Sequence, residues 1–367
     1  MAFNNGSFSN CSYDTILDFS DAVVAKKNMY SSTEHFFIVL VLPIIFVVGV
    51  LGNMAFIFTV IRVRKMKTVT NTYLVQVSIA DFLLVTYTCI SYVHSYLLTP
   101  VRFDVTYDSF IGCMMTFYFV LTTYFASLIL ITFVTIERYY AICKPLQHRL
   151  VSGKSRTVKI IVASWLLGVV FGGCVVPRYA GFVRYCVKWP EDEMFRAFPS
   201  IIELCVPAHP DIYLFSEIFQ TAPYFLAMFA NIYMYSHIIF ALSSRPSTVE
   251  SDDASNLHTL RVRNQVARLL IINGILFFIC QTPYRFASIH NMMVHQSGTG
   301  LFNSTQYGSI LVISRCFLLA NACVNPFVYV TTSSIYRRAF IEALSCTKSS
   351  RATSLADNTQ SMYIVKQ

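Results

Sequence analysis

The sequence predicts an all-α membrane protein, a seven-transmembrane helix bundle with a short amphipathic eighth helix. Of the 367 residues, 55% are hydrophobic and only 13% are charged, and the mean hydropathy is +0.55. The apolar residues gather into runs of about 20 or more, which is enough for a helix to cross the ~30 Å hydrocarbon core of a bilayer. An average soluble domain carries about 25% charged residues, so this composition argues against a soluble enzyme. We expect that the chain is not an enzyme.

Seven stretches are long enough to cross the membrane: 36–61, 72–98, 110–142, 158–176, 212–242, 266–293 and 307–329. An eighth, 335–344, is too short. Its Tyr336, Phe340 and Leu344 recur at helical spacing against Arg337 and Arg338, which predicts an amphipathic helix on the membrane surface. The chain therefore divides into an N-terminal segment (1–35), a membrane body (36–333), the surface helix (334–345) and a tail (346–367).

The basic residues predict the orientation of the chain. Most of the 28 lysines and arginines fall in the first, third and fifth loops and the tail, whereas acidic residues prevail on the other side. Positive loops stay in the cytoplasm, so we expect a plasma-membrane protein with its N-terminus outside and its C-terminus inside. Three glycosylation sequons, at Asn5, Asn10 and Asn303, fall on the predicted outer face. The basic inner face suits anionic membrane lipid, so the net charge of +9 requires no nucleic acid.

Several polar side chains lie at membrane depth, where a charged group costs at least ~2.5–3.5 kcal/mol. Asp81 is in the second span and Ser127 in the third, while Asn321 and Asn325 share one face of the seventh. A carboxylate with hydroxyl and amide oxygens suits a hard cation, and Na⁺ is the occupant we expect. A protonated Asp81, hydrogen-bonded within an ordinary polar core, is the alternative that stays open.

Other features indicate helices that rearrange. Glu137-Arg138-Tyr139 closes the third span, and Asn325-Pro326 removes a helical hydrogen bond from the seventh. Pro223 and Pro283 interrupt the fifth and sixth spans in the same way. Simple kinks, and an ordinary ion pair between the adjacent acid and base, are the alternatives.

The motifs in all seven spans match one family in order and spacing. They are Gly52-Asn53, Ser78-Ile79-Ala80-Asp81, Glu137-Arg138-Tyr139, Trp165, Pro223, Phe277, Cys280-Gln281-Thr282-Pro283 and Asn325-Pro326-Phe327-Val328-Tyr329. With this set, the chain resembles a rhodopsin-like (class A) G-protein-coupled receptor over residues 36–345. The resemblance implies that the helix of the sixth span (266–293) moves outward to activate a heterotrimeric G protein. It also implies that receptor kinases and arrestin act on the tail.

The resemblance also implies roles for matching positions. An allosteric sodium ion is the one ion implied, and no cofactor is expected. The implied groups are the sodium pocket (Asp81, Ser127, Asn321 and Asn325), the inner latch (Glu137, Arg138 and Tyr139), the seventh-span switch (Asn325, Pro326 and Tyr329) and the packing connector (Pro223, Leu128 and Phe277). Three positions depart from the family. Gln281 replaces the usual tryptophan, which argues against activation by the swing of an indole. Asn231 replaces a tyrosine and Arg263 stands where many members have an acid, a pattern compatible with a weakly held inactive state and with basal activity.

The ligand class follows partly from absences. Val120 replaces the aspartate of amine receptors, and Leu319 replaces the lysine of opsins. Pro283-Tyr284-Arg285, together with Arg315, resembles the thyrotropin-releasing-hormone receptor group, whose matching arginines help bind short, often amidated neuropeptides. The expected ligand-binding residues are Arg285, Arg315, Tyr284, Tyr124, Leu121, Tyr96 and Gln281.

Alternatives to this ligand site stay open. Either arginine could instead pair with Glu217 or with an outer-loop acid. The chain could also be an orphan or decoy receptor for a non-peptide ligand. A transporter would show inverted repeats, and the sequence contains no such repeat.

The cysteines complete the sequence predictions. The family pattern implies that Cys113 pairs with a cysteine of the second outer loop, where Cys186 and Cys205 compete. The Cys-x-x-Trp-Pro context favours Cys186, which would leave Cys205 to pair with Cys11. Cys346 follows the surface helix and is the expected palmitoylation site.

Overall fold

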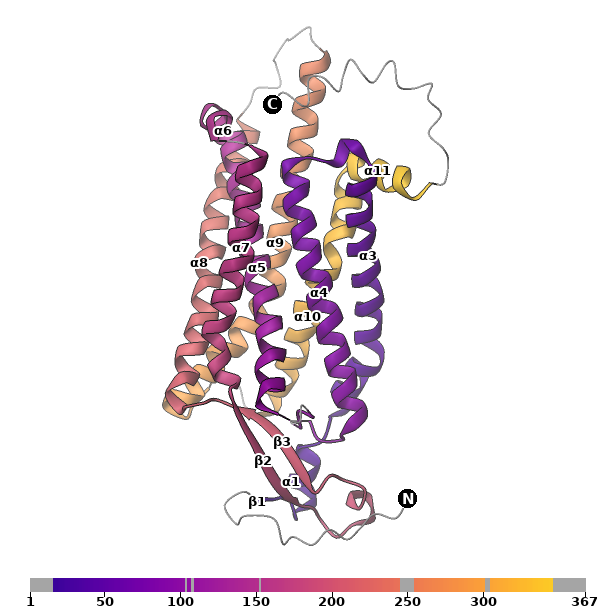
Figure 1. Cartoon of the computed structure of the whole chain (residues 1–367), viewed down its shortest axis with the longest axis vertical. Coiled ribbons are helices and arrows are strands. Elements are labelled where there is room, and N and C mark those ends of the chain that lie inside the picture. Colours follow the sequence, from indigo (N-terminus) through magenta and orange to yellow (C-terminus); the bar gives the residue numbers. More distant parts are fainter. Residues whose placement is uncertain are drawn as a thin grey trace.

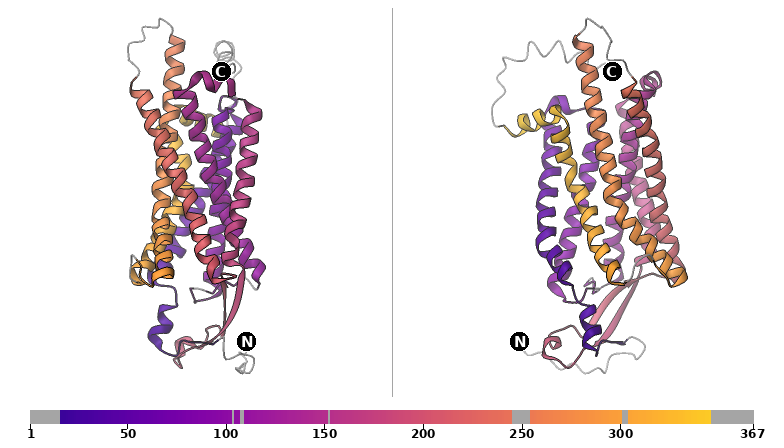
Figure 2. Two further views of the ribbon diagram at one scale, coloured as in Figure 1. Left: turned by 90° about the vertical axis from the view of Figure 1, so that its left-hand side faces the viewer. Right: turned by 180° about the vertical axis from the view of Figure 1, so that it is seen from behind.

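Long helices lying side by side form the body of the molecule (Figures 1 and 2). The computed structural model describes residues 16–102, 104–106, 109–151, 153–244, 254–300 and 304–345. Within these residues, seven helical stretches are long and apolar enough to cross a membrane, which confirms the predicted fold class. They are Ser32–Arg62, Val69–Leu98, Phe110–Cys143, Lys154–Tyr179, Asp211–Ser243, Val262–Ser297 and Ile310–Thr332.

The bundle is built from α2 (Ser32–Phe36), η3 (Phe37–Val41), α3 (Leu42–Arg62), α4 (Val69–Leu98), α5 (Phe110–Cys143), α7 (Lys154–Val175), η5 (Val176–Tyr179), α8 (Pro210–Ser243), α9 (Ala254–Ser297) and α10 (Ser304–Thr332). Shorter helices are α1 (Ala22–Lys27), η4 (Arg64–Met66), α6 (Pro145–Val151), η6 (Glu193–Phe195) and α11 (Ser334–Leu344). Several helices extend past the predicted spans because a helix continues into water while its residues remain helix formers.

The exterior of the bundle differs from that of a soluble protein, because it is apolar while some polar groups are buried. Large apolar side chains such as Leu51 and Leu226 are exposed on the outside, 63% and 72% respectively, whereas Asn53 and Asp81 are buried inside. Lipid solvates the apolar exterior, so polar groups gain partners only within the bundle. Close packing supports this arrangement. A Cβ on Gly172 of α7 would approach Thr122 Oγ1 of α5 to 2.8 Å, so glycine lets these two helices touch.

Helix α11 leaves the bundle axis at a steep angle (Figure 1), which agrees with the predicted eighth helix. Tyr336, Ala339 and Ala343 are buried against the bundle, while Ile341 and Leu344 are 64% and 62% exposed. Such a helix presents its free apolar residues to the membrane surface.

A three-stranded sheet projects from the other end of the bundle. Strand β2 (Gly181–Lys188) pairs antiparallel with β3 (Ile201–Val206) and parallel with β1 (Ile16–Asp18). We call this the sheet end and the opposite one the α11 end. An aromatic cluster closes the tip of the sheet, with the Trp189 ring stacked on Phe195 and in contact with Phe19 and Phe198.

The disulfide prediction was wrong. Cys113 of α5 is bonded to Cys205 of β3, not to Cys186, and therefore Cys205 does not pair with Cys11. The strand register explains the choice, since Cys205 lies opposite Phe182, near the end of the hairpin that joins the bundle. Cys186 lies opposite Ile201 at the far end, beside β1, and is itself disulfide-bonded.

Some predictions fall on positions outside the described residues. These are the sequons at Asn5, Asn10 and Asn303, the palmitoylation site Cys346, and Cys11.

The disulfide yields a prediction. The bridge joins residues 92 positions apart, so Cys205→Ser should lower the free energy of unfolding of the purified protein by about 2–5 kcal/mol. Thermal unfolding should therefore occur at a lower temperature, whereas Cys174→Ser, at a free cysteine of α7, should have little effect. Peptide mapping without reductant should recover Cys113 joined to Cys205. A peptide joining Cys113 to Cys186 would contradict the pairing.

Candidate functional site

Arg285 is a buried cation near the sheet end of α9. Its side chain is only 1% exposed, and its guanidinium carbon lies 4.7, 5.2 and 5.3 Å from the ring centres of Tyr124, Tyr284 and Tyr224. Nη1 donates to the Gln220 carbonyl at 3.3 Å, while Nε has no partner among the described residues. A guanidinium held by aromatic faces, with donors to spare, is suited to bind an acceptor group.

Glu217 does not neutralise Arg285. Its buried carboxylate accepts a hydrogen bond from Arg178 Nη1, in η5, so the predicted alternative of pairing with Arg285 or Arg315 is wrong. The Arg178 guanidinium also lies 4.4 Å from the centre of the Tyr213 ring. Arg178 was missed by the sequence analysis, although a basic residue at the end of an apolar span is a visible signal.

Arg315 of α10 completes a group that we call the arginine cluster: Arg178, Arg285 and Arg315. The Arg315 guanidinium lies 5.3 Å from the Tyr92 ring centre, and Tyr284 is within electrostatic range of all three arginines. Among the described residues, neither Arg285 nor Arg315 forms an ion pair with a carboxylate. Within the described part of the chain, the arginine cluster therefore carries more positive charge than Glu217 offsets, and Arg285 is its buried member.

The remaining predicted ligand residues divide between two places. Leu121 and Tyr124 belong to one buried cluster, and Gln281 is 2% exposed with no partner for Oε1. Tyr96 lies instead against the N-terminal segment, where its hydroxyl bonds His35 and its ring meets the edge of Tyr30. Burial there raises the pKa of Tyr30 to about 12, and the nearby Glu34 carboxylate acts in the same direction.

Midway along the bundle, Asp81 is a buried carboxylate with no cation as partner among the described residues. Asn325 Nδ2 donates to Asp81 Oδ2 at 2.5 Å. Ser127 Oγ, Ser78 Oγ and Asn53 Oδ1 are also buried, and each is without a partner in the part of the chain described. Asn321 is 4% exposed on the same helix as Asn325. One carboxylate with several neutral oxygens fits a small monovalent cation.

At the α11 end, Glu137 pairs across helices and not with its neighbour in the sequence. His148 Nε2 of α6 lies 2.8 Å from Glu137 Oε1, and Arg156 Nη1 of α7 lies 3.8 Å from Oε2. Arg138 Nε is buried without a partner among the described residues, so the alternative of an ordinary pair between Glu137 and Arg138 does not describe this structure. Tyr139 lies at the edge of His237 of α8.

Aromatic residues connect the seventh span to α11. The Tyr329 ring packs on Phe56 and Tyr336, with centroids 4.7 and 5.6 Å away. Tyr336 Oη donates to Asn71 Oδ1 of α4 at 2.5 Å, and burial raises the pKa of Tyr336. No sequence motif predicted this link between α4 and α11.

One departure from the family pattern, Asn231, forms side-chain contacts of its own. Asn231 Nδ2 donates to Thr132 Oγ1 at 3.1 Å, and the nearby hydroxyls of Tyr235 and Thr135 lie 3.0 Å apart. Leu128 and Phe277, predicted as connector residues, both belong to the buried cluster that contains Leu121 and Tyr124. The helices α5 and α8 are thus joined by polar contacts where the motif changes.

Comparisons with known proteins agree with this arrangement. The family model described as "7 transmembrane receptor (rhodopsin family)" matches residues 52–329. The human cholecystokinin receptor type A is 25% identical over 353 residues, with 84% of this chain and 80% of the relative covered. Mouse neuromedin-U receptor 2 is 28% identical over 313 residues (83% and 74% covered), and the mouse thyrotropin-releasing hormone receptor is 24% identical over 366 residues (91% and 85%).

Proposed function

Because the chain belongs to the rhodopsin family of seven-transmembrane receptors, we propose that it is a G-protein-coupled receptor for a short peptide. The observation that carries the proposal is Arg285, a buried cation that is enclosed by tyrosines and has no carboxylate partner among the described residues. Peptide carbonyls and carboxylates match the fixed fork of guanidinium donors. The names of the three relatives, which specify cholecystokinin, neuromedin-U and thyrotropin-releasing hormone, support a peptide ligand.

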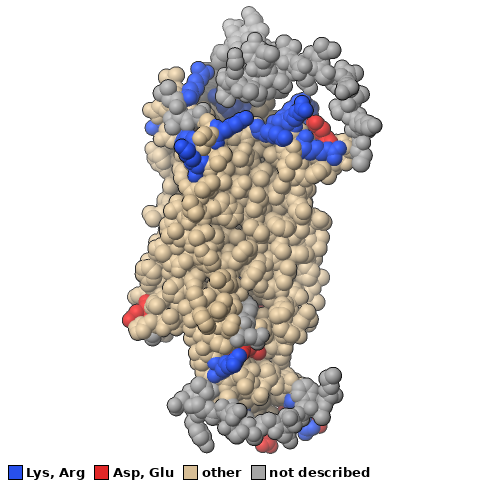
Figure 3. Space-filling model, in the orientation of Figure 1, with Lys and Arg blue, Asp and Glu red and all other residues tan. Residues whose placement is uncertain are grey.

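We propose that the sheet end faces outward and the α11 end faces the cytoplasm of the plasma membrane. Lysines and arginines gather at the α11 end, above an uncharged girdle (Figure 3). Arg64, Lys65 and Lys67 are exposed there, as are Arg337 and Arg338 on α11. Basic segments remain on the cytoplasmic side, where they meet anionic lipid.

Signal transfer starts in α9 in this proposal. Tyr224, whose ring faces Arg285, donates from Oη to the Phe278 carbonyl at 2.8 Å and so joins α8 to α9. A ligand group that binds Arg285 changes the net charge beside this contact between α8 and α9. If it binds more tightly when α9 is displaced outward, it shifts the population towards that state. A G protein, and later the receptor kinases and arrestin, would engage the opened α11 end.

The experiment that tests the function is a calcium and cAMP screen of cells expressing the protein against a library of short amidated neuropeptides. For any active peptide, Arg285→Ala or Arg315→Ala should raise the effective concentration at least ~10-fold, because each removes an acceptor-binding cation. Surface expression should stay normal.

The matched control is Arg196→Ala, since the Arg196 side chain is 73% exposed at the sheet end and pairs with Glu193, whose side chain is 84% exposed. Its potency should equal that of the wild type. Unchanged potency in both Arg285→Ala and Arg315→Ala would remove the arginine cluster from the ligand site. A library without any active peptide would count against the peptide ligand itself.

A second proposal concerns the buried side chains of Asp81, Ser127, Asn321 and Asn325, which we propose bind sodium. At a sodium concentration ten times the dissociation constant, the ion would stabilise the receptor by about 1.4 kcal/mol. Replacing sodium with choline should lower the melting temperature of the wild type but not that of Asp81→Asn. Asp18→Asn, at an exposed aspartate of β1, should keep the wild-type response. An equal sodium response in all three proteins would contradict the site.

The contacts of Glu137 give a further prediction. Glu137→Gln weakens the contacts of this side chain with His148 and Arg156, so α5 loses one set of polar contacts with α6 and α7. Without ligand, nucleotide exchange on a purified G protein should rise about two- to threefold, because the helix arrangement of this structure loses contacts that stabilise it. Glu342→Gln, at an exposed glutamate of α11, is the control. A basal rate equal to that of the wild type would show that these contacts do not restrain the receptor.

A further inference from the structure

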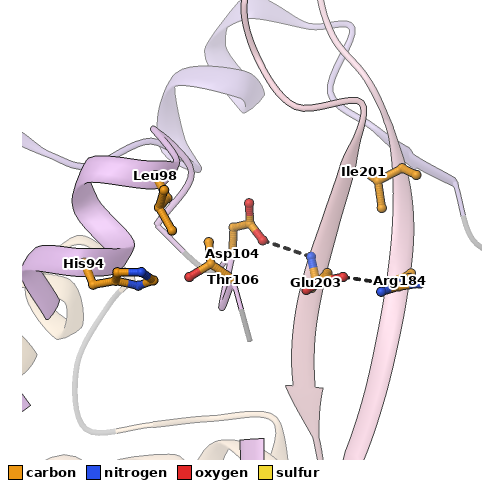
Figure 4. Close-up of a pocket in the computed structure, with 7 residues that line it drawn as sticks. All are labelled: His94, Leu98, Asp104, Thr106, Arg184, Ile201 and Glu203. Carbon is orange, nitrogen blue, oxygen red and sulfur yellow. Dashed lines mark hydrogen bonds and ion pairs between the residues drawn. The ribbon is translucent and has the colours of Figure 1, made fainter. Parts of the chain in front are cut away.

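A cavity of about 590 Å³ lies outside the helix bundle, between the sheet end of α4 and strand β3 (Figure 4). None of its lining residues belongs to the arginine cluster or to the other groups discussed above. Its lining residues are His94, Leu98, Asp104, Thr106, Arg184, Ile201 and Glu203.

Asp104 is the unusual member of this lining. Asp104 is only 7% exposed, and its Oδ1 accepts a hydrogen bond from the Glu203 backbone N–H at 3.0 Å. No ion pair joins Asp104 to a cation in the part of the chain that the structure describes. Burying a carboxylate without a counter-charge is costly, so the charge of Asp104 calls for a partner.

The nearby arginines already have carboxylate partners. Arg102 Nη1 lies 3.7 Å from Glu34, and Arg184 Nε lies 2.9 Å from Glu203. Because Arg184 offsets Glu203, the cavity retains the negative charge of Asp104. The Asp104 carboxylate lies between the end of α4 and β3 (Figure 4).

Two further features describe the chemistry of an occupant. Thr106 Oγ1 is buried and has no partner among the described residues, so it offers a second oxygen to a donor. Leu98 and Ile201 are 60% and 50% exposed and add apolar surface to the same cavity. The cavity therefore combines a buried negative charge, a free hydroxyl and an apolar border.

We propose that this cavity binds an ammonium group that is attached to an apolar side chain. A primary ammonium carries three donors and a positive charge, which match Asp104 and the Thr106 hydroxyl. One part of the inference rests on the proposed peptide receptor, namely that the ammonium group is the amino end of the peptide ligand. The arginine cluster would then bind carbonyl or carboxylate groups nearer the other end of the peptide. The two sites, of opposite charge, would set the direction in which the peptide enters.

The first test uses a small probe and does not depend on the identity of the peptide. Leucinamide has a free ammonium and an apolar side chain, and N-acetyl-leucinamide differs from it by lacking the charge. Saturation-transfer NMR on the purified full-length protein should show that leucinamide binds at least ~10-fold more tightly than the acetylated probe. Asp104→Asn should abolish this preference, while the amide oxygen can still accept from the Glu203 N–H.

The control variant is Asp192→Asn, which removes the same charge from an exposed position in the loop between β2 and β3. It should retain the preference for leucinamide. Equal melting temperatures of the two variants would show that Asp104→Asn is folded. Equal binding of both probes to the wild type, or a preference that survives in Asp104→Asn, would overturn the proposal.

The second test uses each active peptide from the library in free-amine and N-acetylated forms. Asp104→Asn should raise the effective concentration of the free-amine form ~10-fold or more and change that of the acetylated form little. Equal effects on both forms would overturn the placement of the amino end, although the receptor would still respond to the peptide. If no peptide is active while leucinamide still binds through Asp104, the peptide receptor fails and the ammonium site stands.

Discussion

The inability of hydrocarbon to form hydrogen bonds is the constraint on which this structure depends. In lipid, each backbone N–H and C=O must find its partner within the segment, so the chain crosses as helices. The same constraint acts on side chains. Polar groups such as Asn53 and Asp81 can lie at membrane depth only where neighbouring helices enclose them. The bundle interior is therefore polar at selected points, and its exterior is apolar.

Ionisable side chains without an opposite charge mark three separate levels of the molecule. The arginine cluster holds more cations than the single carboxylate of Glu217 can neutralise, and Asp81 has only an amide donor as its described side-chain partner. Asp104, beyond the bundle, is also buried without a counter-ion among the described residues. Burying such groups has a desolvation cost that a bound ligand or ion would offset, so we interpret all three levels as binding sites.

Packing connects these levels. Leu121 and Tyr124, beside Arg285, belong to the same continuous buried cluster as Tyr329 and Tyr336 at the α11 end. Because protein interiors are close-packed, a displacement at one end of such a cluster is transmitted to its neighbours. The hydrogen bonds from Tyr224 to α9 and from Tyr336 to α4 add two fixed points to this network. The cluster offers a physical route between the proposed ligand site and the α11 end.

The sequence by itself determined the seven spans, the amphipathic helix at 335–344 and the family, because hydropathy, helical spacing and ordered motifs are local properties of the chain. It also identified Arg285 and Arg315 as unusual charges at membrane depth. Only the tertiary structure decided the partners of distant residues. The hairpin register brought Cys205 to Cys113, and helix packing paired Glu217 with Arg178 and Glu137 with His148. These pairings depend on which surfaces meet when the helices and strands pack. No local sequence pattern specifies which distant residues then become neighbours.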